Sequence, residues 1–148
     1  MDASLTYGKN ERLKSRKRID LLFKEGKRIS VPPLLFVYRI HAVSGIRNAQ
    51  SIIPMLQAGV GVRSKQFRQA VDRNRIKRLL RESWRTQKNA LRDKVSVGTV
   101  NLDVFILYTG TELPSHAQVS AKTGEGIGKI LERLLQDRSW HTANKESR

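Results

Sequence analysis

The sequence predicts an α+β or α/β sandwich in which helices cover a small β-sheet. Residues 34–40 and 101–108 are rich in β-branched and aromatic side chains, a composition typical of strands. Residues 67–91 contain neither Gly nor Pro and repeat apolar side chains at helical spacing. With 148 residues, the chain has the length of one domain with a single hydrophobic core.

The first element is predicted as a short helix over residues 15–26. Ser15 is a residue type that caps helix N-termini, and Gly26 is a typical C-terminal stop. Between them, Ile19, Leu22 and Phe23 follow the i, i+3, i+4 spacing of one apolar helix face.

Two strands are predicted next, over residues 34–40 and 56–62. Alternation gives the first of them two faces, with Leu34, Phe36, Tyr38 and Ile40 on one and Leu35, Val37 and Arg39 on the other. The second carries Gly59 and Gly61, which indicate a close backbone approach or a bulge.

The rest of the chain divides into a loop, a strand, a helix and two tails. Residues 42–54 are predicted as a surface loop, residues 101–108 as the most hydrophobic strand, and residues 124–136 as a closing amphipathic helix. We expect flexible tails at residues 1–11 and 139–148 around a single domain over residues 12–138.

The strongest functional signal in the composition is its charge. Lys and Arg number 29 against 13 Asp and Glu, which gives a net charge of +16 at neutral pH. Such a surplus predicts a polyanionic partner, either nucleic acid or an anionic membrane surface. The absence of cysteine excludes a disulfide framework, a Cys-based zinc site and a thiol nucleophile. No apolar run reaches the roughly 18–20 residues that span a bilayer.

The cations concentrate around the long helix, where residues 63–94 hold twelve basic side chains and three acidic ones. Helical geometry gathers a buried stripe of Ile76, Leu80, Trp84 and Leu91, with Leu79 beside it. It also aligns a basic row of Lys77, Arg81, Arg85 and Lys88, bordered by Arg78. Like charges at this spacing destabilise a helix, so the row favours a neutralising polyanion over a merely solvated basic face.

The sequence from Arg73 to Glu82, RNRIKRLLRE, resembles the signature R-N-x-x-K-R-x-x-R-[EQ] of the bacterial ribonuclease P protein subunit family. The resemblance extends over roughly residues 12–136 and leaves the tails outside. It implies an α+β fold with a small mixed sheet, the element order α-β-β-β-α-β-α and a left-handed crossover. The strand that periodicity alone does not reveal would then be Ile29–Val31.

The resemblance also implies a function in tRNA maturation. Members of the family partner a catalytic RNA, and together they hydrolyse one phosphodiester bond to remove the 5′ leader of precursor tRNA. The RNA subunit binds the Mg²⁺ and performs the chemistry, so we expect no cofactor and no catalytic residue on the protein itself. We further expect a cytoplasmic protein with no membrane partner and no DNA partner.

The resemblance assigns two groups of residues to RNA contacts. The first group lies on the signature helix and would contact the RNA subunit and the leader. It comprises Arg73, Asn74, Arg75, Lys77, Arg78 and Arg81, together with Lys65 before the helix. The leader-binding cleft would be lined by Phe23 and by Phe36 or Tyr38, since aromatic rings stack on unpaired bases of any sequence. The alternative for Phe23 is a place in the core. The chain departs from the family at Ile19, where an aromatic is common, and at Ser64-Lys65, where two basic residues are common.

Other interpretations remain open or fail on the residues. A non-catalytic RNA-binding protein, such as a ribosomal protein, is the main alternative, and a DNA-binding module with the helix in the major groove is a more distant one. Residues 124–129 resemble a phosphate loop, but the first glycine is misplaced and Ile130 replaces the Ser or Thr that would hold Mg²⁺. His41, His116 and His141 lack metal-ligand spacing.

Overall fold

The computed structural model describes residues 11–42, 56–63, 65–96 and 100–136. The predicted loop over residues 42–54 and the two predicted tails therefore lie outside the described residues, apart from Ala42 and Glu11.

The described elements follow the order α-β-β-β-α-α-β-α. They are α1 (Arg16–Glu25), β1 (Lys27–Val31), β2 (Leu34–Ala42), β3 (Leu56–Val62), α2 (Ala70–Gln87), α3 (Asn89–Ser96), β4 (Val100–Tyr108) and α4 (His116–Gln136). The predicted α+β class is confirmed, and β1 is the strand that the family resemblance implied at Ile29–Val31.

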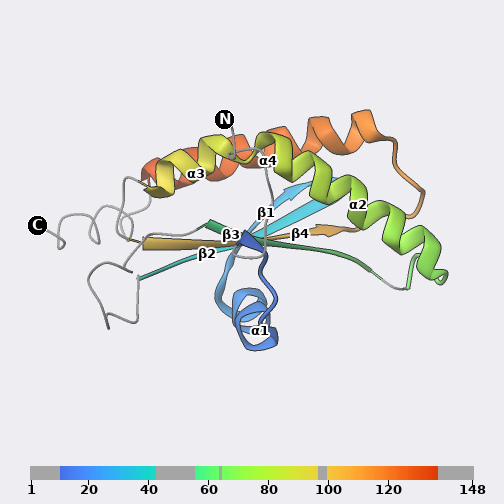
Figure 1. The fold of residues 1–148 in the computed structure, drawn as a ribbon, viewed down its shortest axis with the longest axis horizontal. Helices are drawn as coiled ribbons and strands as arrows, with labels where there is room; N and C mark the ends of the chain where they lie inside the picture. The colour runs from blue at the N-terminus through green and yellow to red at the C-terminus, as the bar shows by residue number, and fades with distance from the viewer. Residues whose placement is uncertain (1–10, 43–55, 64, 97–99, 137–148) are drawn as a thin grey trace, which may run out of the picture.

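The four strands form one mixed sheet in the order β1-β2-β4-β3. β2 pairs antiparallel with β1 and β4, whereas β3 pairs parallel with β4. A crossover through α2 and α3 joins the two parallel strands. Helices α2, α3 and α4 lie on one face of the sheet, and α1 lies alone against the other (Figure 1). The sheet therefore has one closed face and one partly open face.

The main hydrophobic core lies between the sheet and the helices α2 and α4. Phe36 and Tyr38 of β2 contribute to it with exposed fractions of 0% and 1%. Helix α4 approaches the sheet closely at Gly126, where an added Cβ would lie 2.1 Å from the Phe36 ring. A smaller cluster on the other face joins Leu13, Leu22 and Val37 beneath α1.

The first helix has the predicted ends. The Ser15 hydroxyl accepts a hydrogen bond from the Arg18 amide at 3.3 Å, which satisfies one of the free N–H groups of the first turn. The Gly26 amide donates to the Leu22 carbonyl at 2.7 Å. Gly26 has extended backbone angles, so its role is close packing: an added Cβ would meet that same carbonyl at 2.4 Å.

The prediction of one long helix over residues 67–91 is wrong at both ends. Helix α2 begins at Ala70 because Phe67 is buried against Tyr108, with ring centroids 6.0 Å apart, and so belongs to the connection that follows β3. The helix ends at Gln87, and α3 begins after the single residue Lys88.

The closing helix is longer than predicted. α4 starts at His116, eight residues before Gly124, and the Ser115 hydroxyl accepts from the Gln118 amide at 3.1 Å to cap it. The glycines of the phosphate-loop-like segment lower helix propensity, which hid the first two turns from the sequence pattern. That segment lies within α4, so the interpretation as a helix rather than a phosphate loop is confirmed, although it does not begin the helix.

Candidate nucleic-acid interface

The first half of α2 presents the basic side chains of the signature. Arg75, Arg78 and Arg81 are exposed and Lys77 is half-buried, because Ile76 and Leu80 turn inward with no exposed surface. Asn74 is exposed beside them. The predicted apolar stripe is confirmed, since Trp84 and Leu91 are buried as well.

Arg73 plays a different part from the other signature arginines. Its Nη1 donates to the carbonyl oxygens of Phe67 and Arg68, both at 2.8 Å. These bonds tie the connection after β3, which carries the exposed Lys65, to the first turn of α2. Arg73 therefore fixes the backbone ahead of the helix with the same guanidinium that was predicted to contact RNA.

The second half of the predicted basic row does not face outward in the same way. Arg85 forms an ion pair with Glu82 one turn earlier, and this hydrogen bond lowers the pKa of the Glu82 carboxyl below its ordinary value. The side chain of Lys88 is fully buried and pairs with the Glu11 carboxylate. The prediction that Lys88 extends the exposed row is wrong, because the chain turns at this residue and Glu11 packs against it.

The aromatic cleft predicted from Phe23, Phe36 and Tyr38 is not formed. Phe36 and Tyr38 lie in the main core beneath α2 and α4, so neither ring is available to stack on a base. Phe23 is half-buried and lies on the opposite face, packed against the cluster beneath α1. The alternation along β2 was correct, but the aromatic side of the strand is the side that the helices cover.

An aromatic that the sequence interpretation missed, Phe105 of β4, lies next to Phe23. The two ring centroids are 5.0 Å apart in an edge-to-face arrangement with an interplanar angle of 65°. Gly59 and Gly61 of the neighbouring strand make room for the Phe105 ring, since an added Cβ would lie 3.1 Å and 3.0 Å from it. This contact is the close approach that the two glycines indicated. Two glycines on a strand are thus the signal in the sequence from which a large neighbouring side chain, here Phe105, could have been predicted.

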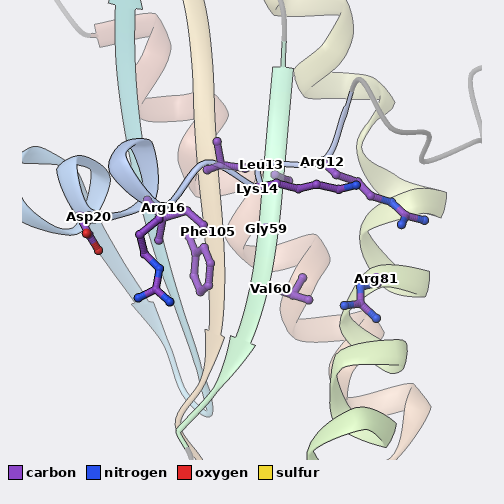
Figure 2. A pocket seen from close by; sticks show the side chains of 11 residues that line it. Arg12, Leu13, Lys14, Arg16, Asp20, Gly59, Val60, Arg81 and Phe105 are labelled. Carbon is purple, nitrogen blue, oxygen red and sulfur yellow. The ribbon is translucent and has the colours of Figure 1, made fainter.

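A groove of about 400 Å³ lies beside Phe105 and extends around the edge strand β3, between the segment before α1 and helix α2. Four basic side chains and one carboxylate line it, namely Arg12, Lys14, Arg16, Arg81 and Asp20 (Figure 2). Ile19 also lines it, at the position where the family commonly has an aromatic. Oriented cations around an apolar floor create a positive potential that attracts phosphate groups.

Helix α1 is held on the open face by a buried carboxylate. Asp103 of β4, which is 2% exposed, pairs with Arg18 of α1 at 2.5 Å, and its other carboxylate oxygen lies 3.2 Å from Nε2 of His41 on β2. Glu25 at the end of α1 pairs with Arg39 of β2 at 3.6 Å. These contacts fix the helix that carries Phe23 relative to the strand that carries Phe105.

The described part of the chain lacks two kinds of site, a metal centre and a membrane-spanning helix. Within it, no three His, Asp or Glu side chains lie close enough to hold a metal ion together. None of the helices described there has both the length and the apolar composition needed to cross a membrane.

The mixed sheet carries a cationic helix, α2, and a basic groove beside the Phe105 ring. These features define a basic α+β protein of the nucleic-acid-binding class. The family described as Ribonuclease P matches residues 7–130. The chain belongs to the ribonuclease P protein family.

Sequence relatives agree with this assignment. The chain is 37% identical to the ribonuclease P protein component of Porphyromonas gingivalis over 132 residues, which are 88% of this chain and 91% of the relative. It is 30% identical to that of Chlorobium phaeobacteroides over 107 residues, 69% of this chain and 70% of the relative.

The fold is similar to that of two solved proteins. The RNase P protein of Thermotoga maritima matches with a TM-score of 0.58 and 22% identity, over 80% of this chain and 96% of that one. The protein of Staphylococcus aureus matches with a TM-score of 0.56 and 20% identity, over 82% of this chain and 94% of that one.

The predicted function, that of a ribonuclease P protein subunit, is confirmed over the ribosomal-protein alternative.

Proposed function

We propose that the chain binds the catalytic RNA of ribonuclease P through the exposed cations of α2 and holds the 5′ leader of precursor tRNA in the basic groove. The observation that carries this proposal is the pairing of half-buried aromatics with cations on the open face. Phe105 offers ring surface beside Arg12, Lys14 and Arg81, and the half-buried Phe23 ring packs edge-to-face against it. Single-stranded nucleic acid is bound by such a combination, because bases stack on rings while cations follow the backbone.

The division of labour in the ribonucleoprotein follows from the same surfaces. Arg75, Arg78 and Arg81 lie on successive turns of α2 and present guanidinium groups, which grip phosphates with two parallel hydrogen bonds. The protein therefore contributes positioning and neutralisation of phosphate charge. We propose that the RNA subunit binds the Mg²⁺ of the reaction, as the family resemblance implies, and that the particle works in the cytoplasm, where tRNA precursors are processed.

Reconstitution with a bacterial ribonuclease P RNA tests the groove. The affinity of the particle for leader-bearing precursor tRNA and for leaderless tRNA is measured with the wild-type chain and with Phe105→Ala. Stacking is worth about 1–3 kcal/mol per base, so the variant should bind the leader-bearing RNA about 5- to 150-fold more weakly. Leaderless tRNA should be bound almost as before, because it places no base on the ring.

Leu107→Ala, on the same strand and the same face, is the matched control, because Leu107 is half-buried like Phe105 but is not aromatic and does not line the groove. Equal losses of affinity for the two RNAs in Phe105→Ala would contradict the leader assignment. A second control is the purified chain without RNA, which should not cleave the precursor at any Mg²⁺ concentration. Cleavage by RNA-free protein would refute the proposed division of labour.

A further inference from the structure

A fully buried lysine interrupts the basic helix region. Lys88 has no exposed side-chain surface, and its ammonium group pairs with the carboxylate of Glu11, a residue 77 positions earlier in the chain. A buried ammonium group is strongly unfavourable unless a partner compensates its charge. The ion pair therefore holds Glu11 at the junction between α2 and α3.

The residues after Glu11 are held at a second point, on strand β3. Arg12 forms a parallel bridge with Ala58, and the Leu13 amide donates to the Ala58 carbonyl at 2.8 Å. Leu13 is 5% exposed and packs against Leu22 and Val37. The segment from Glu11 to Leu13 thus lies along the free edge of β3 and has two attachment points, one ionic and one in the backbone.

The side chains on either side of Leu13 become part of the groove. In an extended segment neighbouring side chains alternate in direction, so the inward-facing Leu13 leaves Arg12 and Lys14 exposed. Both line the groove, and Figure 2 shows Arg12 extending from this segment toward Arg81 on α2. Two of the four cations of the groove are therefore placed by the segment that Lys88 holds.

We propose that Glu11 and Lys88 are positioning residues, whose ion pair sets Arg12 and Lys14 at the groove for contact with the phosphates of the leader. The inference rests on the proposed function of the groove. It gives Lys88 a part in substrate binding without direct contact with RNA. It also makes the segment before α1 a part of the binding site.

The double variant Glu11→Leu with Lys88→Met tests the pair. Replacing both partners of a buried ion pair by apolar side chains is often neutral for stability, so the variant should fold. Without the ionic attachment the segment is held only at Ala58, and Arg12 and Lys14 lose their fixed geometry. Reconstituted particles should bind leader-bearing precursor about 5- to 10-fold more weakly, the size expected when charge-assisted contacts are loosened rather than removed. Affinity for leaderless tRNA should not change.

A second readout separates positioning from general stability. Amide hydrogen exchange in the free protein should accelerate at Leu13, whose amide bonds to Ala58, while the amides of β4 keep their protection. Lys88→Met alone should show the same selective change, because it removes the ionic attachment and leaves only the carboxylate of Glu11, which water already reaches. This variant serves if the double variant does not fold. Unchanged exchange at Leu13, or equal losses for the two RNAs, would show that the ion pair only stabilises the fold.

Two further variants distinguish failure of the inference from failure of the proposed function. Arg12→Gln with Lys14→Gln removes the groove cations directly. If this variant binds the leader-bearing precursor normally, the groove is not the leader site and the inference falls with it. If it weakens binding while the double variant at Glu11 and Lys88 does not, only the positioning inference is overturned. Glu125→Gln, which breaks ion pairs with Lys122 and Lys129 on α4, away from the groove, is the control and should change neither affinity.

Discussion

The two faces of the sheet use the same kinds of side chain for opposite purposes. The face toward α2 and α4 buries Phe36 and Tyr38 completely, in a core of aliphatic side chains. The face toward α1 leaves Phe23 and Phe105 half-buried and surrounds its groove with cations. One helix cannot cover a four-stranded sheet, whereas three can. The number of covering helices, more than the aromatic character of a strand, decides which rings are available to RNA.

The largest effect should come from an aromatic of the closed face. Phe36→Ala removes a ring with no exposed surface, and such truncations cost about 3–5 kcal/mol of unfolding free energy. Urea unfolding of the free protein measures the loss. Phe105→Ala should lower the unfolding free energy clearly less than Phe36→Ala does, because water already reaches part of the Phe105 ring. If the two variants are destabilised equally, the distinction between the faces is wrong.

The packing of α4 gives a second test of the closed face, with a control in the same helix. Gly126→Ala places a Cβ 2.1 Å from the Phe36 ring, so overpacking should lower the unfolding free energy by about 1–3 kcal/mol. Gly128→Ala meets no atom within 4 Å and should instead stabilise the helix by roughly 0.5–1 kcal/mol. Thermal melts should therefore shift in opposite directions, and shifts of the same sign would contradict this packing.

Along helix α2, the salt dependence of RNA binding should separate Arg81 from Arg85. Each phosphate contact adds about 0.7 to the slope of log K against log salt for single strands. Arg81→Ala should flatten the slope by about one contact, because Arg81 is exposed and lines the groove. Arg85→Ala, one turn later, should change it less, since Arg85 is paired with Glu82. Identical slopes for both variants would show that the basic row acts along its whole length.

The smallest effect is expected from the exposed ion pair itself. The pKa of Glu82 is lowered by its hydrogen bond with Arg85, so the native state binds this proton less readily than the unfolded chain. The stabilising contribution of the pair is complete above the ordinary pKa of 4.5 and is lost as the pH falls through the lowered value. The unfolding free energy of Glu82→Gln, measured by urea unfolding, should therefore lie slightly below that of the wild type at pH 7. The difference between the two should be smaller still at pH 3. A difference that grows on acidification would have the wrong sign.

Periodicity predicted most of the elements because their patterns are local. The apolar stripe of α2, the two faces of β2 and the cap at Ser15 all depend on residues within a few positions of one another. The site was harder to predict because its members come together only through the sheet. Phe105 reaches Phe23 across 82 positions, and Lys88 meets Glu11 across 77. A helical pattern assigned Lys88 to the exposed row, but such a pattern carries no information about Glu11, which packs against Lys88 and leaves it buried.

Separation along the sequence also limited the prediction of the aromatic cleft. Alternation places Phe36 and Tyr38 on one side of β2, and it does not say which side the helices will cover. That choice depends on α4, whose glycine at position 126 lets the helix approach the Phe36 ring. The local pattern therefore predicts which residues share a face, while the packing of distant helices decides what the face does.

The position of β4 in the sheet has a consequence for synthesis of the chain. β4 pairs with β2 on one side and with β3 on the other, and it joins residues as far apart as Leu34 and Tyr108. Before residue 108 leaves the ribosome, β3 has no partner strand and α2 has no completed sheet to pack on. The cationic helix thus emerges beside ribosomal RNA while its apolar stripe is still uncovered. Release of β4 completes the sheet, and release of α4, which packs against α2, ends that interval.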